Sequence, residues 1–397
     1  MVRLIFLLLL TSQLLVSGKE SPERAYFNSE TVLKKEAANG AYAIPKIVST
    51  KQDTILIVFQ DRQGGDWGSS IAPLGMRSTD KGKTWSKPFS LVPEDFFDFS
   101  RFHVKPTGIV VDRIKGKIHV FISRSPLVNR KGETILERWF YTNIQETREL
   151  GRAWFQVSSS DDGKTWTKPR EITEQLIVKA HWQEWSPVHT GFQIESGPHQ
   201  GRMVVPVRCY CPETDPSIHD LKYQFNGLIY SDDGGDTWIP GGKSESSVGE
   251  CSIAERSDGT IYMNHRTSAI ETRNPERLQN LSFDGGDTFT AMEPSGLQDA
   301  RCHAGLIAMS DSNGERVFLL SNVPGPGRKE LTINLSIDEG RSWQPKRVIE
   351  HGPTAYSDLA VLSDGTIVCV FETGEKSSRK DLAIARFNLE WVNSEPL

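Results

Sequence analysis

The eight residues Ser159-Ser-Asp-Asp-Gly-Lys-Thr-Trp166 follow a pattern, Ser-x-Asp-x-Gly-x-Thr/Ser-aromatic, that the chain repeats. The five copies occupy residues 78–85, 159–166, 231–238, 282–289 and 336–343. Asp and Gly between strand-like runs predict a tight turn, because Gly supplies positive φ and Asp bonds back to the local backbone. One such turn per four-stranded unit is typical of a propeller blade, and regular repetition is typical of a ring or array. The repeats therefore predict an all-β, six-bladed β-propeller with blades of roughly 60 residues.

The segments between the motifs have the composition of strands. Residues 54–59, 117–122, 259–264 and 365–371 are rich in apolar and β-branched side chains, and each follows a turn that contains Gly or Asp. The tips of the repeated motifs carry no side chains of catalytic type. We therefore expect the motifs at the outer rim of the propeller, away from the functional face.

The N-terminus has the features of an export signal. A basic start is followed by an apolar run over residues 4–16 and by small residues at 16–18, which predicts a signal peptide over residues 1–18. The apolar run is short for a membrane span, so we expect a secreted or periplasmic protein, with a retained N-terminal anchor as the alternative. Residues 19–40 are predicted to be a lead-in with a short helix or irregular arm, and residues 41–397 the propeller.

Composition excludes some classes of function. The formal net charge of −5 argues against a general nucleic-acid role. The cysteines and histidines show no metal-ligand spacing, and we expect neither a metal nor a cofactor. An odd number of cysteines leaves at least one unpaired within the monomer, so buried thiols or a single disulfide are expected. The cysteines are Cys209, Cys211, Cys251, Cys302 and Cys369.

Four further short sequence motifs resemble those of a known family. They are Gly249-Glu-Cys251 leading to Asn264-His-Arg266, Pro326-Gly-Arg328, Ala355-Tyr-Ser-Asp-Leu359 and Phe371-Glu-Thr-Gly374. In order and spacing the chain resembles the sialidase (neuraminidase) family of glycoside hydrolases, whose repeated turns are called Asp boxes or BNR repeats. The resemblance covers residues 42–387. It implies an exo-acting, retaining glycosidase that hydrolyses terminal sialic acid from glycoconjugates through a tyrosyl-enzyme intermediate.

The family's chemistry gives the catalytic residues their roles. A sialoside carries a carboxylate on its anomeric carbon, which would repel a carboxylate nucleophile. Sialidases instead use a Tyr, and its ordinary pKa near 10 calls for a base partner. By resemblance, Tyr356 is the nucleophile, Glu250 its base and Asp66 the general acid/base. Glu255 is the alternative to Glu250 as the base, and Asp61 is the alternative to Asp66 as the general acid/base. Without a catalytic role, Tyr356 would be a core aromatic residue and Asp66 a solvated loop residue.

The family holds the substrate carboxylate with three arginines, because a planar guanidinium meets a carboxylate in two hydrogen bonds. Arg266 and Arg328 match two of the three. The third belongs to a phrase aromatic-Arg-Ile-Pro, where this chain has Ala43 in place of the arginine. Glu372, which in the family supports that arginine, is retained.

The substitution at Ala43 leaves alternatives open. Lys46, Arg62 or Lys105 could replace the missing arginine, although Lys46 is three residues away and would face the other side of a regular strand. Arg62 and His303 are further candidates for the substrate pocket. The substrate could instead be a different nonulosonic, ulosonic or uronic sugar, or the protein a non-catalytic carbohydrate-binding propeller. The retained catalytic set favours an enzyme.

Overall fold

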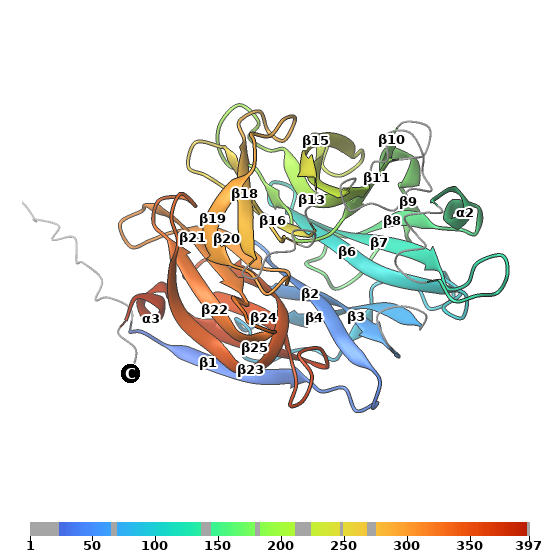
Figure 1. The fold of residues 1–397 in the computed structure, drawn as a ribbon, viewed down its shortest axis with the longest axis horizontal. Coiled ribbons are helices and arrows are strands. Elements are labelled where there is room, and N and C mark those ends of the chain that lie inside the picture. Colours follow the sequence, from blue (N-terminus) through green and yellow to red (C-terminus); the bar gives the residue numbers. More distant parts are fainter. Residues whose placement is uncertain are drawn as a thin grey trace, which may run out of the picture.

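The computed structural model describes residues 24–64, 70–135, 144–178, 183–210, 224–246, 249–267 and 275–394. The chain is all-β, with 53% strand and 4% helix (Figure 1). The short helical elements are α2 (Ile144–Glu149), the 3₁₀ helix η1 (Thr173–Gln175) and α3 (Leu389–Asn393). No helix in the described ranges is long and apolar enough to cross a membrane.

The first sheet has eight strands in the order β2-β3-β4-β6-β7-β8-β9, with β5 paired to β4. Its strands are β2 (Ala41–Ser49), β3 (Ile55–Arg62), β4 (Ile71–Ser78), β5 (Phe89–Ser90), β6 (Phe102–Asp112), β7 (Lys117–Pro126), β8 (Ala153–Ser159) and β9 (Arg170–Glu171). Neighbouring strands are antiparallel except β4 and β6, which meet in a parallel pair only at Ile71 and His103. The sheet therefore consists of two antiparallel groups, β2–β5 and β6–β9.

Two further sheets follow along the chain. One has the order β10-β11-β13-β14-β15 with β12 on β13, and the other the order β16-β17-β18-β19. Their strands are β10 (Ile177–Val178), β11 (Gln183–Pro187), β12 (Phe192–Gln193), β13 (Met203–Tyr210), β14 (Gln224–Ser231), β15 (Ile239–Ser246), β16 (Cys251–Glu255), β17 (Ile261–His265), β18 (Glu276–Ser282) and β19 (Glu293–Gln298).

The last sheet has seven strands in the order β1-β25-β24-β23-β22-β21-β20. They are β1 (Phe27–Leu33), β20 (Gly305–Ser310), β21 (Arg316–Asn322), β22 (Lys329–Ser336), β23 (Gln344–Val361), β24 (Ile367–Thr373) and β25 (Asp381–Phe387). The 18-residue strand β23 pairs with β22 up to Pro353 and with β24 from Thr354 onward. It therefore joins two antiparallel groups into one sheet.

The N-terminal segment differs from the expected helix or irregular arm. Residues 27–33 form strand β1, which pairs antiparallel with β25 near the other end of the chain (Figure 1). Phe27 stacks on Trp391 of α3, with ring centroids 4.5 Å apart. The pairing covers the edge of β25, which would otherwise expose unpaired backbone groups. The two ends of the described chain are thereby held together.

The five Asp boxes have the same hydrogen bonds. In the second box, Thr165 donates to Asp161 through its backbone N (2.9 Å) and its Oγ1 (2.6 Å), and the Gly163 N donates to Ser159 Oγ (2.9 Å). The other four boxes repeat this set. Gly163 has φ of 79°, the left-handed conformation that favours Gly. The turn chemistry predicted from the sequence is confirmed.

Strand register places the boxes far from the functional face. In the β3–β4 pair, Ser78 of the first box lies opposite Ile55, at the other end of β3 from Arg62. In the β13–β14 pair, Ser231 of the third box lies opposite Met203, away from Arg208. Arg62 and Arg208 line the cavity described below. The box aromatic residues belong to hydrophobic core clusters or pack against them.

Replacing Asp233 with Ala is expected to lower the free energy of unfolding by about 1–2 kcal/mol, because it removes hydrogen bonds to a charged group. Asp233 accepts from Ser231, Asp236 and Thr237. The matched control is Asp236→Ala, since only the backbone of Asp236 enters that network. Denaturant unfolding of both variants checks this, and equal stabilities would contradict it. Turnover by the folded Asp233→Ala protein should be unchanged.

The boxes also predict a pH dependence of stability. Burial alone would raise the pKa of Asp80, but hydrogen bonds from Thr84, Ser78 and Lys83 outweigh it and lower the pKa to about 2. The pKa of Asp233 is likewise lowered to about 2. A depressed carboxyl pKa stabilises the fold fully above the unfolded value of about 3.9, and this stability is lost as the pH falls toward 2. The Tm should therefore fall steeply below about pH 4.

Candidate active site

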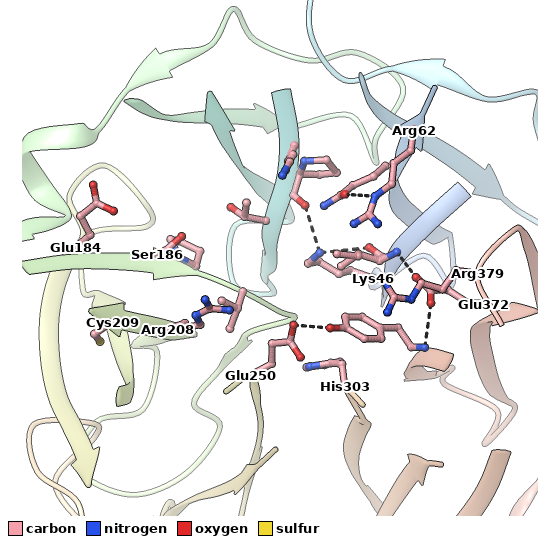
Figure 2. Close-up of a pocket in the computed structure, with 18 of the residues that line it drawn as sticks. Lys46, Arg62, Glu184, Ser186, Arg208, Cys209, Glu250, His303, Glu372 and Arg379 are labelled. Atoms are coloured by element: carbon pink, nitrogen blue, oxygen red, sulfur yellow. Dashed lines mark hydrogen bonds between the residues drawn. The ribbon is translucent and has the colours of Figure 1, made fainter. Parts of the chain in front are cut away.

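A cavity of about 220 Å³ opens among the ends of strands from several groups. Figure 2 shows two clusters of charged side chains along it, with Arg62, Glu372 and Arg379 on one side and Glu184 and Arg208 on the other. Its lining residues include Ile44, Lys46, Gln60, Arg62, Lys105, Pro106, Thr107, Arg152, Glu184, Ser186, Arg208, Glu250, His303, Tyr356, Glu372 and Arg379. Cations outnumber carboxylates in this lining, which favours an anionic ligand.

Tyr356 and Glu250 line this cavity, and Arg266 contacts both of them from behind its described lining. Tyr356 lies in the second half of β23, and Glu250 and Arg266 flank the β16–β17 hairpin, where the Arg266 N donates to the Glu250 carbonyl at 2.8 Å. The Tyr356 hydroxyl donates to Glu250 Oε1 at 2.6 Å. Arg266 Nη1 donates to Tyr356 Oη at 2.7 Å and also forms an ion pair with the Glu250 carboxylate. The hairpin thus fixes a carboxylate and a guanidinium against one phenol.

The charges of this cluster keep the proton on Tyr356 and leave Glu250 ionised. Burial would raise the pKa of Glu250, but the Arg266 charge and the hydrogen bonds of Tyr356 and Arg266 outweigh it and lower the pKa to about 2. Burial, with the Glu250 charge, raises the pKa of Tyr356 well above its ordinary value, against the opposing effect of Arg266. The phenol is therefore neutral and the carboxylate ionised before substrate arrives. Arg266 adds a positive charge beside the phenol oxygen.

Arg328 and His303 also border Tyr356. The guanidinium carbons of Arg328 and Arg266 lie 5.6 and 5.9 Å from the Tyr356 ring centroid, and the His303 ring lies at 5.7 Å. Arg328 Nη2 donates to the Arg301 carbonyl at 2.9 Å. Arg328 Nη1 and Arg266 Nε are buried without a hydrogen-bond partner among the described residues. Buried donors of this kind are normally satisfied, so they indicate a binding site for an anion.

Glu372 joins β2 to β23, the strand that carries Tyr356. Its fully buried carboxylate accepts hydrogen bonds from the backbone N of Ile44 (2.8 Å) and of Tyr356 (3.3 Å). Burial raises its pKa, against hydrogen bonds and the charges of Arg62 and Arg379. Glu372 therefore positions Tyr356 in addition to bordering the cavity.

The prediction that Lys46 faces away is wrong. The β2–β3 register shifts between Ala43 and Lys46, and Ile44 has φ of 50°, so the strand bulges and turns Lys46 into the cavity wall. The Lys46 side chain is fully buried, with Nζ 3.3 Å from the Pro106 carbonyl and 3.4 Å from that of Ile44. Burial lowers its pKa to about 8.

Two alternatives from the sequence are not supported by geometry. Glu255 accepts hydrogen bonds from the backbone N of Glu195 and Ser196, both at 2.8 Å, and does not line the Tyr356 cavity. Asp61 forms an ion pair with Lys35 and is likewise absent from the described lining. Glu250 is therefore the base candidate that the fold places beside Tyr356.

The first sheet supplies two of the other predicted residues. Arg62 lines the cavity and its Nε donates to Gln60 Oε1 at 2.9 Å, and Lys105 lines the cavity from β6. Asp66, the predicted general acid/base, lies outside the described residues. Ala43 is fully buried and lies directly opposite Gln60, on the same face of the sheet.

Sequence reasoning missed a second charged wall. Arg152 Nη2 lies 2.7 Å from Glu184 Oε2, with both side chains largely buried, and Arg208 follows on β13 opposite Ser186. It also missed Arg379. None of these residues belongs to a recognisable local phrase, and they approach the cavity only through strand register and a loop. Alternation along β13 alone would have placed Arg208 on one of two faces.

Comparison with known proteins identifies the family of the chain. The profile of a family described as a BNR repeat-like domain matches residues 109–369, more than half of the chain. A sialidase of Micromonospora viridifaciens is 28% identical over 370 residues, covering 88% of this chain and 52% of that protein. A sialidase of Bacteroides fragilis is 27% identical over 359 residues, covering 84% of this chain and 60% of that protein. The chain belongs to the sialidase family with BNR repeats.

Solved sialidase structures share the fold. The Hadza microbial sialidase Hz136 superposes with a TM-score of 0.72 at 24% identity, covering 88% of this chain and 66% of that one. Trypanosoma rangeli sialidase superposes with a TM-score of 0.69 at 17% identity, covering 92% and 60%. The chain thus spans between about half and two thirds of the length of these members of the sialidase family.

Proposed function

We propose that the protein is an exo-acting, retaining glycosidase that hydrolyses terminal sialic acid from glycoconjugates, on a six-bladed β-propeller. The observation that carries the proposal is the hydrogen bond from the Tyr356 hydroxyl to the ionised Glu250, with Arg266 beside both. The six blades are the antiparallel groups β2–β5, β6–β9, β10–β15, β16–β19, β20 to the first half of β23, and the second half of β23 to β25 with β1. An export signal over residues 1–18 would place the enzyme outside the cytoplasm.

In the first step Tyr356 Oη attacks the anomeric carbon, and its proton passes to Glu250. The bond to the leaving oxygen breaks as that oxygen takes a proton from the general acid, which the sequence assigns to Asp66. Arg266 and Arg328 neutralise the substrate carboxylate next to the reacting carbon. In the second step the deprotonated general acid, assigned to Asp66, removes a proton from water, and this water displaces Tyr356 from the anomeric carbon. Glu250 then returns the proton to the Tyr356 oxygen. Two displacements retain the configuration.

The substitution at Ala43 supports a second candidate, a related glycosidase for another nonulosonic, ulosonic or uronic sugar. A clamp with one arginine absent from its usual position is suited to a carboxylate held at another angle. The retained contact between Tyr356 and Glu250 favours either enzyme over a carbohydrate-binding propeller without turnover, because binding alone needs no activated phenol.

The test is purified protein with fluorogenic glycosides of N-acetylneuraminic acid, its deaminated analogue, a uronic acid and a neutral hexose. We expect the N-acetylneuraminyl glycoside to be cleaved most efficiently, and NMR to show the α anomer as the first product. Preference for another acidic sugar would favour the second candidate. Inversion at the anomeric carbon, or binding without turnover, would contradict the proposed mechanism.

A further inference from the structure

Arg379 reaches the cavity from a segment that lies beside Ala43. The loop between β24 and β25 returns to the sheet at Lys380, whose N donates to the Thr373 carbonyl at 3.2 Å. The carbonyl of Lys380 accepts from the Tyr42 N at 3.0 Å. Lys380, next to Arg379, is therefore hydrogen-bonded to Tyr42, next to Ala43, although the two segments lie far apart in the sequence.

No arginine is present at Ala43 to pair with Glu372. Ala43 offers only a methyl group, while Glu372 remains as a fully buried carboxylate that accepts a hydrogen bond from the next residue, Ile44. A buried carboxylate needs hydrogen bonds and a nearby positive charge. Glu372 accepts hydrogen bonds from two backbone N–H groups. Figure 2 shows Arg379 on the same side of the cavity as Glu372, and both line it. Arg379 and Arg62 both act electrostatically on Glu372.

We propose that Arg379 is the third cation of the substrate-carboxylate clamp, and that it acts from the β24–β25 loop in place of the arginine absent at Ala43. Arg379 would grip the carboxylate together with Arg266 and Arg328, with Glu372 as its support. This inference rests on the proposed function, because it assumes a substrate that carries a carboxylate.

Two of the other cations, Lys46 and Arg62, fit this role less well. Lys46 is fully buried, and two backbone carbonyls lie near its Nζ. Arg62 is 6% exposed and its Nε is engaged by Gln60. Arg379 is half-buried, so part of its side chain faces the space that a ligand would fill. A guanidinium also presents the paired donors that a carboxylate accepts.

The test compares a carboxylate ligand with its uncharged form. Affinities of the 2,3-unsaturated analogue of sialic acid and of its methyl ester are measured calorimetrically for wild type, Arg379→Ala and Lys376→Ala. Lys376 is the control, since it is exposed in the same loop and does not line the cavity. We expect Arg379→Ala to weaken binding of the acid by about 30-fold or more, as for a truncated charge pair. The ester should change by less than about threefold, and the control should bind both ligands as wild type does.

Equal weakening of acid and ester in Arg379→Ala, or no weakening of the acid, would overturn the inference while leaving the proposed function intact. Wild type that binds neither ligand would overturn both. A second variant tests the same question at Ala43 on β2. Ala43→Arg introduced into Arg379→Ala should recover at least about tenfold in acid affinity if the two positions serve one ligand group. The acid-to-ester comparison does not depend on whether this double variant folds.

Discussion

Replacing Tyr356 with Phe is expected to lower kcat by about a thousandfold or more, the scale seen when a covalent nucleophile is removed. The change deletes one oxygen, and the ring keeps its neighbours His303 and Arg328. KM should change little, because Arg266 and Arg328 stay in place to bind the substrate. Steady-state kinetics and a thermal unfolding curve check the result.

The control for Tyr356→Phe is Tyr230→Phe, since Tyr230 lies on β14, outside the described lining of the cavity. Its kcat should match that of wild type. A kcat for Tyr356→Phe within tenfold of wild type, with the fold intact, would mean that the phenol does not take part in bond making.

Glu250→Gln is expected to lower kcat by about 10²- to 10⁴-fold, the usual contribution of a positioned general base. The amide is nearly the same size but does not accept the phenolic proton, and it leaves Arg266 without its ion pair. The exposed Glu195 is the matched control, since it contacts Arg316 well outside the Tyr356 cavity. Equal kcat values for Glu195→Gln and Glu250→Gln would contradict the assignment.

The wild-type pH profile tests the same carboxylate without a mutation. A base must be deprotonated to act, and the Glu250 pKa is lowered to about 2. Titration of Glu250 should therefore produce no loss of kcat/KM near pH 4.5, where an unperturbed Glu would lose its charge. Rates measured from pH 4 to 8 check this. An acid limb near pH 4.5 that disappears in Glu250→Gln would show that Arg266 does not hold the carboxylate ionised.

The sequence was sufficient for features whose interactions are local or repeated. Each Asp box is determined by hydrogen bonds that span four residues, so the pattern alone predicted the turn. The pairing of Tyr356 with Glu250 joins residues 106 apart in sequence and was predicted only by family resemblance. Family resemblance also named Arg266 and Arg328, which the fold brings to the same phenol.

The bulge at Ile44 could not be predicted in this way. A positive φ is unfavourable for a β-branched residue, and here the Ile44 N bonds to Glu372, which lies 328 residues further along the chain. Regular alternation therefore placed Lys46 on the wrong face. Strand β1 is similar, because its side chains are mostly exposed and its partner β25 is near the other terminus. Both features depend on contacts between segments that lie more than 300 residues apart in the sequence.

The most direct test of the account is to trap the glycosyl-enzyme with a 2,3-difluorinated sialic acid and map the labelled peptide by mass spectrometry. Attack by Tyr356 Oη would expel the fluoride at C2, with the phenolic proton passing to Glu250, and the fluorine at C3 would slow hydrolysis of the product. A covalent intermediate on Tyr356 predicts one glycosyl group on the peptide that contains Tyr356, and none on Tyr356→Phe. A label on Glu250 or Glu372, or active wild-type enzyme that is never labelled, would contradict it.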